Sequence, residues 1–285
     1  MSVITVIGSG QMGSAMSVPA RHNGHEVRLV GTHLDREIID RLRIDNYHIN
    51  LKRYLPEGCK YYQLEELDEA LKGTDVIIGG VSSFGVDWFC ENILPIIPEE
   101  IPLLSITKGL INLEDGTLIS YLDYYKQHLN GRKVSLNAVG GPCTSYELAD
   151  LDPTTVCFCG DDIELLRKLR EMFRTEFYHI SVSTDVLGIE SAVAMKNAYA
   201  LGVSLAVGLA ERKERIWFLD FMPTMIGEAR KTFEICLISS ACASFRVSIF
   251  TRAFKSKISN FLRATKSKQL WSYMLEVSKP SLFNN

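Results

Sequence analysis

The sequence predicts an α/β fold in which a doubly wound parallel sheet is followed by a smaller, all-helical C-terminal domain. Short apolar runs alternate with stretches of helical periodicity up to residue 183, as in a parallel sheet covered by helices on both faces. Beyond that point the strand-like runs stop and long helical periodicity takes over. A glycine-rich stretch, residues 8–13, separates the first apolar run from the first predicted helix, as in Rossmann-type folds. We therefore predict a Rossmann-type domain over residues 1–183 and a helical domain over residues 184–285.

The expected elements follow one another regularly along the first domain. Strands are expected where apolar and β-branched residues cluster, at Val3–Ile7, Glu26–Val30, 75–79, 103–106, 134–139, 155–159 and 177–182. Helices are expected between them, at 12–23, 35–42, 64–71, 88–97, 117–128 and Ile163–Phe173. The stretch 43–63 contains Pro56-Glu57-Gly58 and is expected to be a polar connection. Because helices alternate with strands, we expect the sheet to be parallel.

Composition and charge exclude several classes of function. The chain of 285 residues has 46% hydrophobic and 23% charged residues, as globular proteins do, and a formal net charge of -3. A polyanion-binding surface normally needs excess positive charge, so we exclude nucleic acid as a partner. The seven cysteines form no CxxC pair and no cluster with histidine, so we expect reduced thiols and no metal.

The sequence shows neither an export signal nor a membrane span. Residues 1–3 lead directly into the first predicted strand, without the basic and long apolar regions that secretion requires. The apolar stretch 191–210 carries Lys196 and Asn197 in its first half, where they would be costly in a bilayer. We therefore expect a cytoplasmic protein without stable membrane insertion.

The stretch Gly8-Ser9-Gly10-Gln11-Met12-Gly13 fits the GxGxxG pattern of dinucleotide-binding loops. The first glycine of that pattern permits a tight turn, the second lets the backbone approach a pyrophosphate, and the third allows close packing of helix and strand. The free N–H groups at the helix N-terminus then face the pyrophosphate. Since the motif lies between a strand and a helix that leads to a second strand, we predict that Gly8, Ser9, Gly10, Gln11, Met12 and Gly13 bind a dinucleotide.

The end of the second predicted strand leaves NADP and NAD both open as the cofactor. An Asp or Glu at this point usually binds the ribose 2′-hydroxyl of NAD, but here Val30 is followed by Gly31, Thr32 and His33. Asp35 lies slightly further on, and Arg36 could meet the 2′-phosphate of NADP. Alternatively, Arg36 is a solvated helix residue. We expect Thr32, His33 and Arg36 among the cofactor contacts.

Three further segments place polar groups after predicted strands, where dinucleotide-binding domains have their active sites. They are residues 81–84, 107–109 and 140–143. Within the second segment, Lys108 can present its ammonium group to a carbonyl or phosphate group. Alternatively, Lys108 is a surface lysine in a loop.

Lys196 and Asn197 interrupt a predicted helix that is otherwise almost entirely apolar. A lysine buried in such a helix must be paired or face a cavity, and burial lowers its pKa toward the range useful for proton transfer. The alternative is a lysine at the helix edge whose ammonium group reaches solvent. Together with a dinucleotide, a buried Lys196 points to carbonyl reduction.

Five stretches, in this order, resemble a known family. They are GSGQMG, VSS, SITKGL, GGPCTSYELA and GIESAVAMKNAYALGVSLAVGL, which together cover about residues 3–210. The chain resembles the NAD(P)-dependent glycerol-3-phosphate dehydrogenases, whose C-terminal domain is of the 6-phosphogluconate-dehydrogenase-like type. The resemblance implies hydride transfer between NAD(P)H and dihydroxyacetone phosphate, giving sn-glycerol 3-phosphate.

The resemblance also implies roles for individual residues. Lys196 would be the general acid/base, oriented by Asn197, and Lys108 would contact both substrate and cofactor. Gly141 and Cys143 would lie beside the substrate. Ser145 would lie beside the cofactor, and so would the turn formed by Ser82, Ser83 and Phe84. We further expect a homodimer.

The resemblance weakens after about residue 212, where the composition becomes basic. The Arg-Asn pair with which the family grips the substrate phosphate has no counterpart there, and Cys143 replaces a small hydroxyl or an amide residue. We expect the helical domain to be divergent or truncated from that point. The alternatives to a glycerol-3-phosphate dehydrogenase are a related hydroxyacid or ketoacid reductase and a cofactor-binding pseudoenzyme.

Overall fold

The computed structural model describes residues 1–113 and 115–194, all of which belong to one compact unit. Lys196, Asn197 and the predicted helical domain beyond residue 194 lie outside these described residues. Within them, no helix has both the length and the apolar character needed to cross a bilayer.

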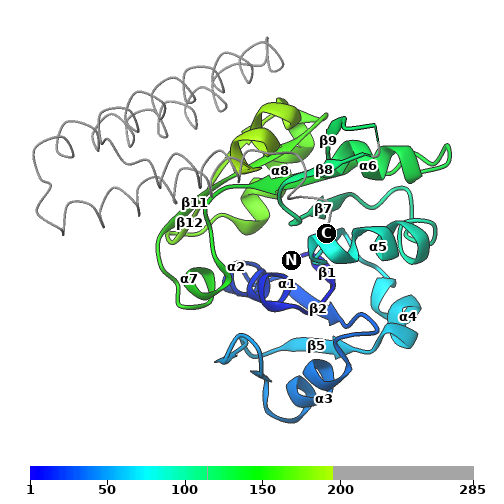
Figure 1. The fold of residues 1–285 in the computed structure, drawn as a ribbon. Helices are drawn as coiled ribbons and strands as arrows, with labels where there is room; N and C mark the ends of the chain where they lie inside the picture. The colour runs from blue at the N-terminus through cyan, green and yellow to red at the C-terminus, as the bar shows by residue number, and fades with distance from the viewer. Residues whose placement is uncertain (114, 195–285) are drawn as a thin grey trace, which may run out of the picture. The chain divides into compact units, whose positions relative to one another are not determined.

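An eight-stranded sheet forms the centre of the described unit (Figure 1). Six parallel strands lie in the spatial order β5-β2-β1-β6-β7-β10. Their bounds are Val3–Ile7 for β1, Glu26–Val30 for β2, Cys59–Tyr62 for β5, Val76–Gly79 for β6, Leu103–Ser105 for β7 and Leu136–Gly140 for β10. In chain order this arrangement is 3-2-1-4-5-6, the strand order of a Rossmann fold, whose ligands bind where the order reverses. The Rossmann-type prediction is confirmed.

The last two strands of the sheet run in the opposite direction, so the expectation of an all-parallel sheet is wrong at this edge. β11 (Thr154–Gly160) is antiparallel to β10, and β12 (Tyr178–Ser183) is parallel to β11. The reason is the length of the connections. Helix α7 (Ser145–Ala149) spans only about 7.5 Å and cannot carry the chain back along the sheet. Helix α8 (Ile163–Phe173), with eleven residues, is long enough to do so between β11 and β12.

Helices cover both faces of the sheet, as predicted (Figure 1). One face packs on α1 (Gln11–Ala15), α2 (Ser17–His22), α3 (Arg36–Asp45), α7 and α8, and the other on α4 (Leu67–Leu71), α5 (Val86–Asn92) and α6 (Tyr121–His128). Side chains alternate between the two cores, because successive strand residues point to opposite faces. In β1, for example, Ile4 and Val6 enter one core and Ile7 enters the other.

Five of the six predicted helices begin or end at other residues, and three of the differences have a local cause. The first is divided at Met16 into α1 and α2, because Pro19 has no N–H group to donate back to the preceding turn. Helix α5 ends at Asn92, shortly before Pro95. Helix α6 begins only at Tyr121, where Ser120 caps it by accepting a hydrogen bond from the Asp123 N–H.

The remaining short elements were not predicted. Strand β9 (Leu118–Ser120) occupies the start of the expected helix 117–128, and it forms a hairpin with β8 (Leu110–Asn112). The expected polar connection contains the hairpin of β3 (Tyr47–His48) and β4 (Arg53–Tyr54) as well as the edge strand β5. Two 3-10 turns, η1 (Leu64–Glu66) and η2 (Ser83–Gly85), directly precede α4 and α5, and η1 lies within the helix expected at 64–71.

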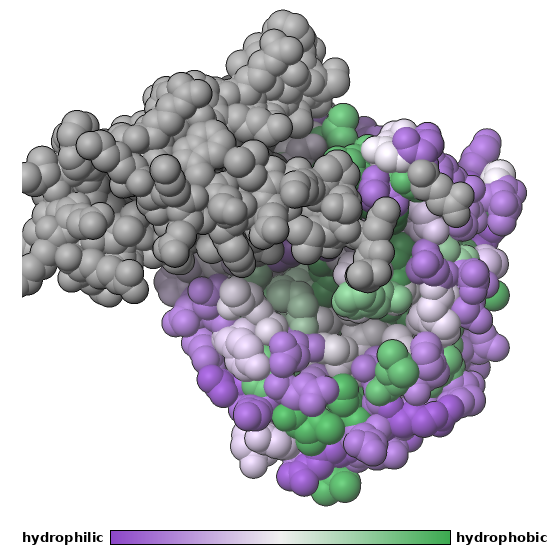
Figure 2. Space-filling view, in the orientation of Figure 1, coloured by the Kyte–Doolittle hydropathy of each residue, from purple (hydrophilic) through white to green (hydrophobic). Residues whose placement is uncertain are grey.

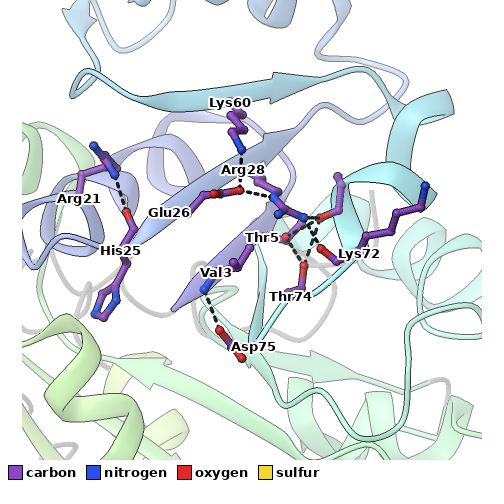
Figure 3. A network of polar contacts seen from close by, with 11 residues as sticks. Val3, Thr5, Arg21, His25, Glu26, Arg28, Lys60, Lys72, Thr74 and Asp75 are labelled. Carbon is purple, nitrogen blue, oxygen red and sulfur yellow. Dashed lines mark hydrogen bonds and ion pairs between the residues drawn. The ribbon is translucent and has the colours of Figure 1, made fainter. Parts of the chain in front are cut away.

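A polar network crosses the amino ends of the central strands (Figure 3). Glu26 accepts hydrogen bonds from Arg28 Nε at 2.7 Å and from Lys60 Nζ at 2.9 Å. Arg28 also donates to the carbonyl oxygens of Ala70 and Lys72, at the end of α4. The network therefore joins β2, β5 and α4 at the sheet edge opposite the glycine-rich loop.

We expect Glu26→Gln to destabilise the protein at pH 7 by about 1 kcal/mol, since hydrogen bonds to a charged group are lost near the surface. The hydrogen bonds from Lys60 and Arg28 hold the pKa of Glu26 below its usual value. This stabilisation is therefore present above the unfolded-state pKa and disappears as the pH falls through the lower, folded-state pKa. Urea unfolding at pH 7 and pH 3 measures it, with the exposed Glu100→Gln as control. An equal destabilisation at both pH values would contradict the assignment.

Candidate functional site

The candidate site lies at the carboxyl edge of the parallel strands. The turns after β1, β2, β6 and β7 start side by side, since Gly8 N donates to Val30 O at 2.9 Å and Gly80 N to Ile7 O at 2.8 Å. Ile106 N likewise donates to Gly79 O at 3.1 Å. Five sequence-predicted segments are thereby brought to one edge: residues 8–13, 32–36, 82–84, 108 and 141–145.

The structure gives a different reason for glycine at each of the three glycine positions of the loop. Gly8 has a φ of +104°, and a Cβ there would lie 2.8 Å from the Gly80 carbonyl carbon. A Cβ on Gly13 would lie 2.1 Å from Gly8 O, so this glycine lets the helix approach the strand. A Cβ on Gly10, by contrast, would meet no atom within 4 Å. Gly10 therefore leaves open space beside the loop, where the motif places a pyrophosphate.

The loop also offers hydrogen-bond donors that suit an anion. The hydroxyl oxygen of Ser9 is buried and has no hydrogen-bond partner among the described residues. No side chain caps α1 at Gly10, so the first N–H groups of this helix are available. A buried donor without a partner is unfavourable unless a ligand binds it. The residues present therefore fit the phosphates of a dinucleotide.

We expect Gly10→Ala to lower dinucleotide affinity by about tenfold while preserving stability, because the added methyl group occupies space outside the protein core. Gly13→Ala should instead destabilise the fold by about 2 kcal/mol, since its methyl group collides with backbone. Cofactor titration and urea unfolding of both variants separate the two effects. A Gly10→Ala protein that binds cofactor as tightly as the parent would contradict the placement of the pyrophosphate.

The residues after β2 are held by Asp35. Its Oδ2 atom accepts hydrogen bonds from Thr32 Oγ1 at 2.7 Å, Thr32 N at 2.9 Å and Ser9 N at 3.2 Å. Asp35 thus joins this turn to the glycine loop. Arg36 is exposed and forms an ion pair with Glu65. A 2′-phosphate bound here would therefore compete with the Glu65 carboxylate for the Arg36 guanidinium group.

The segment after β6 is exposed at the same edge. Ser82, Ser83 and Phe84 are all exposed, and the Phe84 side chain is 98% exposed. Beside them, the ring of His33 lies against that of Trp88 on α5, with centroids 5.2 Å apart. The visible described surface is otherwise mostly hydrophilic, with apolar residues in separate patches (Figure 2).

Lys108 joins the turns after β7 and β10. Its Nζ atom donates to the carbonyl oxygens of Gly141 at 3.2 Å and Cys143 at 3.1 Å. Gly141 has a φ of +143°, and Cys143 is buried. Ser145 follows as the first residue of α7 and is also buried. The structure therefore brings together the three predicted substrate contacts that lie within the described residues.

The helical segment 186–194 packs on the end of β10. A Cβ on Gly140 would lie 2.3 Å from Ile189 Cγ2, so only a glycine allows this approach. The segment also carries Glu190, whose buried carboxyl group lies near Ser120 and the backbone at the start of α6. Sequence reasoning assigned no role to Glu190.

His48 is a second residue that sequence reasoning missed. Its side chain is fully buried under the glycine loop, with Nε2 2.9 Å from Ser9 O. A lone histidine in a polar connection carries no sequence signal of such a contact.

One known family matches the larger part of the chain. The family model described as "NAD-dependent glycerol-3-phosphate dehydrogenase N-terminus" matches residues 3–165, more than half of the chain. The chain belongs to this family.

Individual members of the family match over a longer stretch. The chain is 34% identical over 213 residues to the NADP(+)-dependent glycerol-3-phosphate dehydrogenase of Archaeoglobus fulgidus, a match covering 74% of this chain and 62% of the relative. It is 29% identical to the glycerol-3-phosphate dehydrogenase [NAD(P)+] of Shouchella clausii, over 73% of this chain and 61% of the relative. This member of the family thus matches about three fifths of the length of its curated relatives.

Solved structures show the same fold. The glycerol-3-phosphate dehydrogenase of Coxiella burnetii aligns with a TM-score of 0.59 at 23% identity, over 73% of this chain and 62% of the other. That of Plasmodium falciparum aligns with a TM-score of 0.64 at 20% identity, over 82% and 67%. The family's fold is therefore shared over the larger part of the chain.

Proposed function

We propose that the chain is a glycerol-3-phosphate dehydrogenase that transfers a hydride between NAD(P)H and dihydroxyacetone phosphate to give sn-glycerol 3-phosphate. The observation that carries the proposal is the contact of Lys108 with the Gly141 and Cys143 carbonyl groups, at the same sheet edge as the glycine loop. An ammonium group is thereby fixed beside the loop that fits a dinucleotide. The names of the family members support the same activity.

Different residues of the chain would bind the cofactor, bind the substrate and transfer the proton. Ser9 Oγ and the N–H groups after Gly10 would hold the pyrophosphate, and the Ser82–Phe84 turn, Thr32, His33 and Ser145 would line the remainder of the cofactor site. When bound, the cofactor supplies the hydride, which is its own chemistry. Lys108 would place its positive charge near the substrate oxygen atoms. Lys196 would give a proton to the oxygen of the reduced carbonyl, and Asn197 would orient Lys196.

NADP or NAD remains the proposed cofactor. Arg36 supports NADP, because it is the first residue of α3, directly after the turn that follows β2, and the Archaeoglobus fulgidus relative is named as NADP(+)-dependent. The ion pair with Glu65 opposes it, because a 2′-phosphate would have to compete for the same guanidinium group.

An absorbance assay with dihydroxyacetone phosphate and each reduced cofactor in turn tests the function. We expect oxidation of NADPH or NADH by the parent protein and none by Lys196→Ala. Turnover only with a hydroxy or keto acid would identify the related reductase instead. Cofactor binding without turnover on any member of a substrate panel would identify a pseudoenzyme.

We also propose that the protein acts in the cytoplasm as a homodimer. The sequence supports a reducing compartment, because its seven cysteines form no CxxC pair and no cluster with histidine. The dimer stays a prediction from the sequence, and light scattering should give twice the 32.0 kDa mass of the chain.

A further inference from the structure

The Ser9 peptide groups of the glycine loop are held from both sides. Ser9 N donates to Asp35 Oδ2 at 3.2 Å, as described above. Ser9 O lies 2.9 Å from His48 Nε2 and accepts a second hydrogen bond from Ser14 Oγ at 3.1 Å. Ser14 directly follows the loop, whereas Asp35 and His48 are 26 and 39 residues from Ser9, and His48 comes from a separate hairpin.

The hydrogen bonds of His48 define which ring nitrogen carries the proton. Leu51 N donates to His48 Nδ1 at 3.0 Å, so Nδ1 is the unprotonated, accepting nitrogen. Nε2 therefore carries the hydrogen and donates it to Ser9 O. The ring is fully buried, and this burial lowers the pKa of His48, which keeps the imidazole neutral at physiological pH.

The hairpin that carries His48 is itself firmly attached. Arg53 on β4 forms a two-point ion pair with Asp150, at 2.6 and 2.8 Å, directly after α7. Gln11 Nε2 donates to Asn50 O at 3.0 Å and to the hydroxyl of Tyr146, on α7, at 3.1 Å. The hairpin therefore connects the glycine loop with the helix that begins at Ser145.

We infer that His48 is a positioning residue of the glycine loop, fixing the Ser9 carbonyl group so that Ser9 Oγ and the following N–H groups face the pyrophosphate. The inference rests on the proposed function only for the identity of the ligand. The positioning itself is a property of the protein without cofactor. Preorganised donors bind an anion more tightly, because the binding energy is not used to order the loop.

Two substitutions of His48 separate its two hydrogen bonds. Glutamine places its side-chain N–H near the position of Nε2 and keeps the donor to Ser9 O. Asparagine places its carbonyl oxygen near the position of Nδ1 and keeps only the acceptor for Leu51 N. His179→Asn, on the exposed face of β12, is a control for the substitution itself.

Hydrogen exchange of the protein without cofactor measures the positioning. We expect His48→Asn to accelerate exchange in residues 8–14 while β6 and β7 stay protected, and His48→Gln and His179→Asn to leave the loop unchanged. Unchanged exchange in His48→Asn, or equal acceleration in His48→Gln, would overturn the inference.

Fluorescence titration with NADPH and NADH measures the consequence. We expect His48→Asn to raise Kd about tenfold and His48→Gln to stay within about threefold of the parent. Equal losses in both variants would also overturn the inference. If the exchange result holds but the parent binds neither cofactor, His48 still positions the loop and the proposed function fails.

Discussion

Replacing Lys108 with methionine should reduce kcat/KM for dihydroxyacetone phosphate by about 10²- to 10³-fold, the usual effect of removing a charged group that stabilises a transition state. Methionine keeps most of the volume and the apolar stem of lysine but has no ammonium group. It also removes the hydrogen bonds to the Gly141 and Cys143 carbonyl groups, which join the turn after β7 to the turn after β10.

Steady-state kinetics with Lys133→Met as control measures this effect. Lys133 is exposed and precedes β10, so its loss should not change turnover. Cofactor Kd values, obtained by titration, show how much of the loss comes from cofactor binding. Turnover by Lys108→Met within threefold of the parent would contradict the role of this residue.

Glu190→Gln should raise the free energy of unfolding above pH 7 by up to about 3 kcal/mol. This is the free energy that the folded parent loses because its buried carboxyl group must ionise, and glutamine does not ionise. Burial is the main reason that the pKa of Glu190 is raised to about 7, and the nearby charge of Asp123 adds to the shift. In the unfolded chain the same group ionises near its ordinary value of 4.5. The stability of the parent therefore falls as the pH rises from about 4.5 to 7, whereas glutamine cannot ionise.

Urea unfolding of the parent and of Glu190→Gln at pH 5 and pH 8 measures the difference, with the exposed Glu91→Gln as control. The two proteins should be similar in stability at pH 5, and the glutamine variant should be more stable at pH 8. A stability difference independent of pH would show that Glu190 does not titrate in this window.

The fold was predictable from the sequence where a local pattern determines the structure. Periodicity and capping residues give β1, β2 and α8 their observed bounds. Strand β5 was missed because it is an edge strand, with Lys60 and two half-buried tyrosines in place of an apolar run. The direction of β11 depends on the length of α7, which apolar patterns do not report.

The candidate site was predictable where loops after parallel strands must meet. This rule and the resemblance to the family predict that Lys108, Gly141 and Cys143 lie close together. His48 was missed because its partners, Ser9 O and Leu51 N, are backbone groups. A carbonyl oxygen or an N–H group is present at almost every position, so the sequence cannot show which one a distant side chain contacts.

The reversal of β11 and β12 also determines where the chain leaves the sheet. β12 runs opposite to β10. Its last residue, Ser183, pairs with Cys159 of β11, which in turn pairs with Ala138 in the middle of β10. The following helical segment then runs back toward the carboxyl edge of the parallel strands, where Ile189 packs against Gly140. If α7 were long enough to keep β11 and β12 parallel to β10, β12 would end at the carboxyl edge of the sheet. The helical segment 186–194 would then start at the loops of that edge and run away from them.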